Sequence, residues 1–440
     1  MRIVEGAQEA RRTILCRQPA SEIELGPAGR ARTAAVFGAE LSAAEAVRRI
    51  IADVRAEGDA AVRRYGEAFD GTSVVELEVA PSAIDAALAR IEPELRAALE
   101  LAAERIRAYH AGQLRRTLTS YEEGGLGVQV RPIETVGFYA PGTAPAYPSS
   151  VLHSVIPATV AGVSRLVLVS PAGPDGTPPD VKLAAAAIAG VDRVFTASGA
   201  QAIAALAYGT ETIPRVDKIC GPGSIFVTLA KRAVFGDVGI DSIFGPTETV
   251  IVADAAADPV LCAVDLIAQA EHDELASPIL ITPSARLAEQ VAAEVELRLA
   301  DLPREAVARA AFNNRGGAVI AASMEEAVDL ASEFAPEHLC LLSRDARRLA
   351  ARVKNAGGIF LGESSPEAIG DYTAGPSHVM PTGGAARFAS PLSVQDFLKL
   401  STVMEIGDET VYEIGPAGAA IARAEGLIGH ARAIEERLPR

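Results

Sequence analysis

The chain has 440 residues, of which 49% are hydrophobic and 22% are charged, and its formal net charge is −16. A chain of this length exceeds one ordinary hydrophobic core, so we expect two or more domains. The negative charge argues against nucleic acid or an anionic membrane surface as the main partner, because both are polyanions. No apolar run reaches the ~18 residues of a membrane helix, and the charged N-terminus lacks the apolar core of a signal peptide. Four scattered cysteines without a C-x-x-C pair favour free thiols in the cytoplasm.

The first ~110 residues are predicted to be mainly helical. Residues 42–45 (SAAE) form a capping box that opens a helix ending near Gly58. Ser82 is expected to cap a second helical region that runs to about Gln113. His110 lies in that region, and we interpret it as a packing or surface histidine.

From Val128 onward, apolar strands alternate with helices. A strand-like run ends in a turn rich in Gly and Pro at 137–142, followed by a helix at 151–162. The pattern then predicts strands at 165–170, 193–197 and 218–220 and helices at 181–190, 201–208 and 224–235. Such alternation is typical of a parallel sheet covered on both faces.

Ligands of parallel α/β sheets bind at the carboxyl ends of the strands, which draws attention to the turns at 198–201 and 221–224. Neither turn has the G-x-G-x-x-G pattern, because Phe226 occupies the third glycine position. The signal for a dinucleotide is therefore weak, and two plain strand-to-helix turns remain an equal alternative.

The stretch 245–282 predicts a strand at 249–253, a helix, and a strand at 278–282. Gln269 and His272 are three residues apart, so both side chains are expected on one face of the last helical turn. Polar groups aimed together between two buried strands could hold a metal or a substrate. The alternative is a histidine favoured near a helix C-terminus by the helix dipole.

Further along, helices at 287–299 and 324–334 and a strand at 317–321 continue the alternation. Glu337 and His338 stand at the mouth of the next strand, 340–343. A general base and a water-activating carboxylate would be useful together there, although a solvated loop pair is an equal alternative.

Turn-forming residues surround Asp371 and His378, which predicts an ordered loop, and helices close the chain. Gln269, His272, Asp371 and His430 could together complete a site rich in nitrogen and oxygen that suits Zn²⁺. Their spacing alone does not join them, because the intervals between them are long.

Taken together, these segments resemble the histidinol dehydrogenase family. The matching segments include GFYAPG at 137–142, GAQAI at 199–203, VDKICGPG at 216–223, QAEH at 269–272 and FAPEHL at 334–339. Others lie at 53–59, 147–151, 207–210, 370–372, 381–384 and 425–430.

The resemblance implies an α/β fold with two incomplete Rossmann-like parallel-sheet domains and small helical N- and C-terminal parts. We therefore predict an N-terminal segment at 1–30, a discontinuous first Rossmann-like domain at 31–138 with 247–392, a second at 139–246, and a tail domain at 393–440. Family members are homodimers, and the tail is expected to reach the site of the partner subunit.

The resemblance also implies the reaction, the oxidation of L-histidinol to L-histidine through the aldehyde with reduction of two NAD⁺. Gln269, His272, Asp371 and His430 stand where the zinc ligands of the family stand. His338 would be the general base, and Glu337 would activate water. The positions on the cofactor side are Tyr139, Gln201 and Ser224. The positions on the substrate side are Thr247, Gln269, His272, His338, Asp371, Glu425 and His430, with His378 in a substrate-binding loop.

Two positions and the segment after His272, which reads DELA at 273–276, depart from the family pattern. Ser224 stands where Asn is usual, and Thr247 stands where Ser is usual. Both retain hydrogen-bonding groups, so the chemistry is expected to stand. The alternatives are a family paralogue that oxidises another small alcohol with NAD⁺, a zinc hydrolase, and a metal-dependent binding protein without catalysis.

Overall fold

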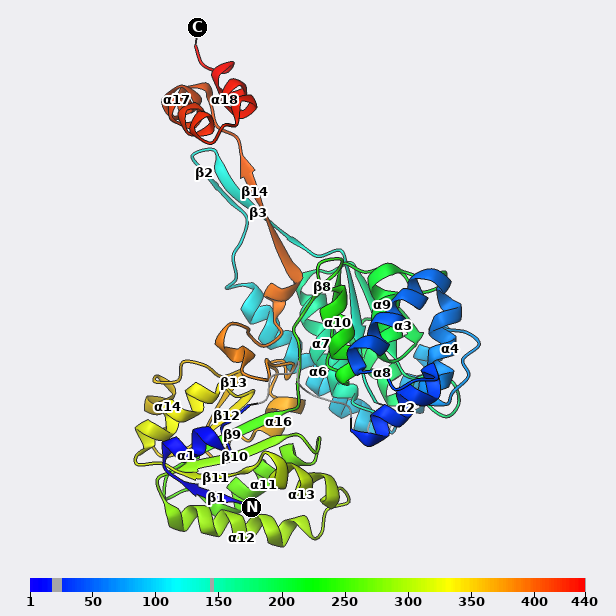
Figure 1. Ribbon diagram of the computed structural model, residues 1–440, viewed down its shortest axis with the longest axis vertical. Helices are drawn as coiled ribbons and strands as arrows, with labels where there is room; N and C mark the ends of the chain where they lie inside the picture. The colour runs from blue at the N-terminus through cyan, green and yellow to red at the C-terminus, as the bar shows by residue number, and fades with distance from the viewer. Residues whose placement is uncertain (18–25, 143–145, 440) are drawn as a thin grey trace. The chain divides into compact units, whose positions relative to one another are not determined.

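The computed structural model describes residues 1–17, 26–142 and 146–439, which divide into two compact units. Unit 1 comprises Met1–Leu114 and Ile133–Phe397, and unit 2 comprises Arg115–Pro132 and Leu398–Arg440. Unit 1 contains a five-stranded and a six-stranded parallel sheet, and unit 2 contains a small antiparallel sheet (Figure 1). The prediction of an α/β fold with two parallel sheets is confirmed.

The five-stranded sheet has the strand order β6-β5-β4-β7-β8. Its strands are β4 (Thr135–Tyr139), β5 (Arg165–Ser170), β6 (Arg193–Thr196), β7 (Lys218–Cys220) and β8 (Gly239–Ile240). The chain starts at the central β4, builds outward to β6, and then returns to place β7 on the other side of β4. This reversal between β4 and β7 is the switch point at which Rossmann-like sheets bind ligands.

Helices cover both faces of this sheet (Figure 1). One layer consists of α2 (Pro27–Phe37), α3 (Ala43–Glu57), α4 (Asp59–Asp70), α9 (Gly199–Tyr208) and α10 (Ile225–Val234). The other consists of α5 (Pro81–Arg90), α6 (Pro93–Leu114), α7 (Pro148–Ala161) and α8 (Asp180–Ala189). Because both faces are covered, the strands are apolar along their whole length.

The six-stranded sheet repeats the same order and adds one strand at its edge, β1-β11-β10-β9-β12-β13. Its strands are β1 (Ile3–Glu5), β9 (Glu248–Ala253), β10 (Ser277–Thr282), β11 (Gly317–Ile320), β12 (His338–Leu342) and β13 (Gly358–Leu361). The helices are α1 (Ala7–Arg12), α11 (Pro259–Ala270), α12 (Ala285–Leu299), α13 (Glu305–Asn314), α14 (Met324–Phe334), α15 (Ala346–Ala350) and α16 (Glu367–Tyr372). All residues of β9, β10 and β12 are buried, as expected for central parallel strands.

Unit 2 consists of three antiparallel strands and two helices. The strands are β2 (Tyr121–Glu123), β3 (Leu126–Pro132) and β14 (Leu398–Met404), and the helices are α17 (Asp408–Ala424) and α18 (Ile428–Glu435). Its fully buried apolar cluster is small, with Ala419, Ala422 and Ala431 packed against Ile434.

Most predicted elements form within a few residues of their expected bounds. The capping box at Ser42 is present, with the Glu45 N–H donating to Ser42 Oγ and the Glu45 carboxylate accepting from the Ser42 N–H. The prediction that Ser82 caps a helix is wrong, because Pro81 occupies the first turn of α5 and Ala80 is the N-cap. The single run expected from Val128 is two strands, since β3 belongs to unit 2 and β4 to unit 1.

None of the helices in the described ranges combines the length and the apolar character needed to cross a membrane. The four cysteines are free, as predicted. The expected domain boundaries remain a prediction.

Candidate active site

Two neighbouring cavities lie in unit 1, and both border the five-stranded sheet at the carboxyl ends of its strands. Cavity A has a volume of about 450 Å³ and is lined mainly by residues at or just after the carboxyl ends of β4, β5, β6 and β7, including Tyr139, Gln201 and Ser224. Cavity B, of about 380 Å³, includes residues after β4 and β7 on one side and Thr247, Glu337 and His338 on the other. Pro141 and Ser224 line both cavities, so the cavities adjoin.

The six-stranded sheet contributes to cavity B with the amino ends of its strands. Thr247 precedes β9, Glu337 precedes β12, and His338 is the first residue of β12. Because β9 and β12 are parallel neighbours with His338 opposite Thr249, their leading residues emerge side by side. The amino edge of one sheet thus meets the carboxyl edge of the other at this cavity.

The backbone around Glu337 and His338 is held from two directions. The Gly358 N–H donates to the Glu337 carbonyl at 2.8 Å, and a Cβ on Gly357 would lie 2.6 Å from that same oxygen. On the other side, Ala335 adopts a left-handed conformation with φ of 52°. A non-glycine residue in this region is strained, and such strain is commonly found where side chains must be aimed.

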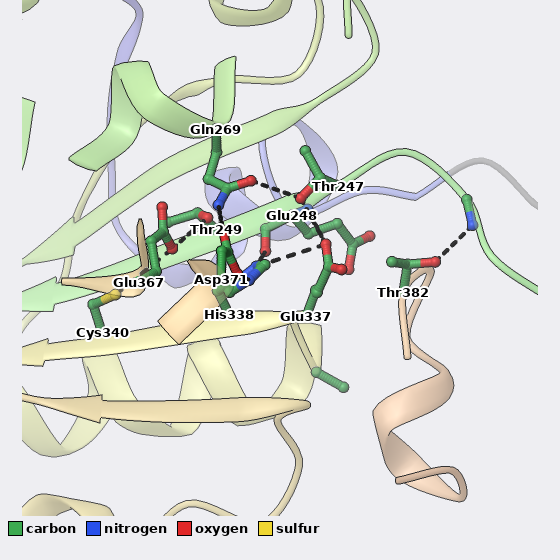
Figure 2. Close-up of polar contacts among 12 residues, drawn as sticks. Thr247, Glu248, Thr249, Gln269, Glu337, His338, Cys340, Glu367, Asp371 and Thr382 are labelled. Atoms are coloured by element: carbon green, nitrogen blue, oxygen red, sulfur yellow. Dashed lines mark hydrogen bonds and ion pairs between the residues drawn. The ribbon is translucent and has the colours of Figure 1, made fainter. Parts of the chain in front are cut away.

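The residues Glu337 and His338 are almost completely buried, with 8% and 3% exposure. The Glu337 carboxylate accepts hydrogen bonds from Thr247 Oγ1 at 2.6 Å and from the Glu248 N–H at 3.2 Å. His338 Nε2 lies 3.4 Å from Asp371 Oδ1, and Nδ1 lies 3.4 Å from the Glu248 carbonyl oxygen. Figure 2 shows these side chains pointing toward one another.

The carboxylates around His338 dominate its protonation. Burial by itself lowers the pKa of the imidazole, but the negative charges of Glu337, Asp371 and Glu367 outweigh it and raise the pKa to about 10. Burial raises the pKa of Glu337 against the opposing effect of His338. Burial also acts to raise the pKa of Asp371, but its hydrogen bond to His338 and the nearby histidines lower it overall.

Gln269 and His272 come from the end of α11 and also line cavity B. Gln269 is buried in the last turn, with Nε2 at 3.5 Å from Asp371 Oδ2 and Oε1 at 2.8 Å from Thr247 Oγ1. His272 lies two residues past the helix, on a turn closed by its own N–H donating to the Gln269 carbonyl. The expectation that both lie on the last helical turn is therefore only half right. Arg304 holds this turn by donating to the Glu271 carbonyl oxygen at 2.8 Å.

Asp371 and His378 were expected in one ordered loop, and this is wrong for Asp371, which lies in the six-residue helix α16. The flanking Gly and Pro residues disguise so short a helix in the sequence. His378 lies in the segment after it, where its Nδ1 is 2.8 Å from the Asp371 carbonyl oxygen. Its ring stacks on the buried ring of His153 with centroids 4.3 Å apart.

Glu425 and His430 are both exposed in unit 2, whereas the other predicted site residues lie in unit 1. On the cofactor side, Gln201 is buried in α9, and the Tyr139 hydroxyl accepts a hydrogen bond from the Gly199 N–H at 3.2 Å. Gly221 has φ of 118°, and a Cβ there would lie 2.2 Å from the Tyr139 carbonyl oxygen, so this turn requires glycine.

Sequence reasoning missed two buried carboxylates beside this cluster. Glu248 is 5% exposed and forms an ion pair with Arg17 at 2.6 Å. Glu367 is fully buried in α16 and accepts from Thr249 Oγ1 at 2.8 Å. Neither has a local signal in the sequence, because each is a single Glu whose partners are distant along the chain.

Comparisons with known proteins show which family the chain belongs to. A sequence model of the histidinol dehydrogenase family matches residues 38–438. A histidinol dehydrogenase from Deinococcus radiodurans is 48% identical over 441 residues, covering all of both chains. One from Geobacillus kaustophilus is 51% identical over 395 residues, covering 89% of this chain and 93% of that one.

The chain belongs to the histidinol dehydrogenase family. It is an NAD-dependent oxidoreductase of histidine biosynthesis that oxidises histidinol to histidine, as the resemblance predicted. The fold agrees as well, because the crystal structure of a histidinol dehydrogenase from Elizabethkingia anophelis superposes with a TM-score of 0.89 at 31% identity. That alignment covers 99% of this chain and 98% of the other.

Proposed function

We propose that cavity B holds histidinol together with a zinc ion, that NAD⁺ lies in cavity A, and that His338 and Glu337 carry out the proton transfers. The observation that carries this proposal is the convergence on one cavity of an imidazole, two carboxylates and an amide from three separate places, the end of α11, the start of β12 and α16. Cavity A adjoins it, so a dinucleotide bound there could extend its reactive ring to the substrate.

The hydrogen bonds of Thr247 support a cation in cavity B. Its hydroxyl lies within bonding distance of two acceptors, Gln269 Oε1 at 2.8 Å and Glu337 Oε2 at 2.6 Å, but it has one proton to donate. Rotating the Gln269 amide by half a turn resolves the conflict, because Nε2 then donates to Thr247. Gln269 Oε1 would then face the Asp371 carboxylate, an arrangement of two oxygens that a bound cation between them would stabilise.

Gln269, His272 and Asp371 would hold this ion in unit 1. They offer two oxygens and one nitrogen, a set that suits Zn²⁺. Among the described residues of one chain, no group of three or more His, Cys, Asp or Glu side chains is arranged to hold a metal. We therefore propose His430 of the partner subunit as the remaining ligand. An ion held by these residues would supply a Lewis-acid anchor for the substrate in cavity B and so help to position the alcohol carbon.

In the first oxidation, His338 would take the proton of the substrate hydroxyl while NAD⁺ accepts a hydride from the carbon that bears this hydroxyl. His338 must be neutral before it can accept this proton. In the metal-free chain, however, the surrounding carboxylates favour the protonated form of His338. A divalent ion on Asp371 would oppose that effect. The products of this step are the aldehyde, NADH and one proton.

In the second oxidation, Glu337 would take a proton from water as the water oxygen adds to the aldehyde carbon, and the aldehyde oxygen would take up the proton that His338 holds from the first step, which gives a diol and leaves His338 neutral. His338 would then deprotonate the diol while a second NAD⁺ accepts hydride, leaving the carboxylic acid. The hydrogen bonds from Thr247 and the Glu248 N–H fix the Glu337 carboxylate for this role. Thr247 thereby links Gln269 to the water-activating group.

The surface of unit 2 supports a homodimer. Among the described residues, half of the large apolar side chains that are exposed lie in unit 2, which is about a seventh of the chain. They include Leu126, Leu400, Met404, Tyr412 and Ile421. Exposed apolar side chains at this density mark a surface that a partner covers. We propose that a second copy covers it, and that Glu425 of the partner subunit and His430 of the partner subunit reach cavity B.

The proposal is tested by counting NADH formed per histidinol consumed and by repeating the count with Glu337→Gln. We expect two NADH per histidinol for the native chain. The variant should perform the first oxidation and release histidinal, because water addition loses its base. Its yield should therefore fall well below two NADH per histidinol consumed. A variant that still reaches two NADH at the native rate would remove Glu337 from this role.

A further inference from the structure

Lys182 is a lysine with no exposed surface in α8, on the helix layer behind cavity A. Its ammonium group donates to the carbonyl oxygens of Ala140 at 3.0 Å and Pro141 at 2.7 Å, and also to that of Gly142. It also lies 2.9 Å from Ser170 Oγ. A buried cation thus holds three successive carbonyl groups of the turn that follows β4.

The charge of Lys182 has no counter-ion among the described residues, since the hydrogen bonds it makes to them all go to neutral oxygens. Lys231, the second buried lysine of the described chain, provides a contrast. It also holds a turn of the cofactor side, by donating to the Gly221 carbonyl oxygen at 3.0 Å, but it is paired with the Asp241 carboxylate. A buried charge is costly unless it is paired. Burial accordingly lowers the pKa of Lys182 to about 7.

The turn at 140–142 separates this ammonium from cavity A. In a trans peptide the C=O and N–H point in opposite directions, so the Gly142 N–H points away from Lys182 when the Pro141 carbonyl points toward it. Gly142 lines cavity A, has φ of 74°, and its N–H meets no acceptor among the described residues. The ammonium therefore polarises a peptide whose donor faces away from it, and such oriented amides attract anions.

The charged side chains that line cavity A are Arg32 and Asp70, one of each sign. Together they bring no net positive charge to a cavity that must accept a dinucleotide with an anionic diphosphate. Lys182 is a nearby source of positive charge that no carboxylate of the described chain neutralises.

We propose that Lys182 is the counter-charge for the cofactor diphosphate, which binds against the face of the 140–142 turn opposite the ammonium group. Lys182 is a positioning residue, because it acts through the polarised turn without touching the cofactor. This inference rests on the proposed placement of NAD⁺ in cavity A.

The test compares an anionic with a neutral ligand, using Lys182→Met and calorimetric titration with ADP-ribose and with adenosine. Removing the charge should weaken ADP-ribose binding about tenfold or more, while adenosine binding changes less than about twofold. Equal losses for both ligands would mean that the turn has collapsed, and unchanged binding of both would mean that the charge plays no part. Either result overturns the proposal.

Lys182→Gln separates charge from hydrogen bonding, because the amide can still donate to the carbonyl groups of the turn. We expect it to weaken ADP-ribose like Lys182→Met, and native affinity would overturn the proposal. Lys354→Met, which removes an exposed lysine, serves as the matched control and should leave both affinities unchanged. Thermal unfolding and zinc content of each variant report whether it is folded.

Gln201→Ala distinguishes the role of Lys182 from the placement of NAD⁺ in cavity A. Gln201 lines cavity A, so its truncation should weaken both ligands if the dinucleotide binds there. If this variant weakens binding and Lys182→Met does not, only the role of Lys182 falls. If neither variant weakens binding, the placement of NAD⁺ in cavity A falls as well, and the inference falls with it.

Discussion

At the scale of single residues, the side chains of cavity B depend on one another through shared protons. Thr247 lies between Gln269 and Glu337, and Asp371 lies between Gln269 and His338. A change at one member therefore alters the orientation or the charge of the next. Buried networks of this kind are sensitive to the loss of any partner, because water cannot replace the missing group.

Thr247→Val tests this coupling, because it keeps the shape of the side chain and removes the hydroxyl. Glu337 would lose one of its two donors, and losing a hydrogen bond to a charged group costs about 1.5–3 kcal/mol. We expect the rate of histidinal oxidation to fall about tenfold or more, with a smaller effect on the first oxidation, measured by steady-state kinetics with each substrate. Thr247→Ser should retain activity, and a fully active Val variant would refute the coupling.

Glu367 should give the folded state a pH-dependent stability. Burial raises its pKa to about 8, whereas in the unfolded chain it titrates near the ordinary value of 4.5. Its contribution is present below pH 4.5 and is lost as the pH rises toward 8, with a slope of up to about 1.4 kcal/mol per pH unit.

Glu367→Gln removes that slope, so the stability of the variant relative to the native chain should rise between pH 5 and about 8. Urea unfolding at several pH values measures it. Glu289→Gln, at an exposed position of α12, is the control and should follow the native curve. Parallel curves for Glu367→Gln and the native chain would contradict the assignment.

At the scale of elements, the site depends on close backbone approaches at the ends of parallel strands. The turns after β4 and β7 meet where a Cβ on Gly221 would lie 2.2 Å from the Tyr139 carbonyl oxygen. The 357–358 segment approaches the Glu337 carbonyl oxygen in the same way in the other sheet. These contacts fix the edges of both cavities.

Gly221→Ala should therefore separate the two turns and impair cavity A. We expect the KM for NAD⁺ to rise at least about tenfold and the melting temperature to fall by several degrees, because φ of 118° also disfavours alanine. Gly66→Ala in α4 is the control, since a Cβ there meets nothing within 4 Å and alanine favours helix. Native kinetics for Gly221→Ala would show that the turn tolerates the displacement.

At the scale of the whole molecule, we propose that each active site combines cavity B of one chain with the tail of its partner. His338→Ala should lose about 10²–10⁴-fold in rate as a missing general base. His430→Ala should lose activity through the metal. Mixing the two inactive proteins under exchange conditions should restore up to about a quarter of the native activity, because about half of the dimers are then mixed and each mixed dimer contains one intact site of its two. No recovery, with subunit exchange shown independently, would place each complete site within one chain.

Local sequence patterns determined the secondary structure and the fold class of this protein. Uniformly apolar strands and amphipathic helices alternate at spacings that allow only parallel sheets covered on both faces. The capping box at Ser42 and the strand 165–170 form where predicted, because the interactions that set them lie within a few residues. The pair Glu337 and His338 could also be singled out, since it stands at the start of a strand.

Only the tertiary structure decided which distant groups meet. His338 at the start of β12 meets Asp371 of the short helix α16, which the sequence pattern did not reveal. Lys182 contacts a turn that lies about forty residues earlier in the chain. Burial and charge balance are properties of that packing, so the raised pKa of His338 and the unpaired charge of Lys182 have no local signature. The sequence gives the chemical type of each side chain, but the tertiary packing decides which side chains contact one another.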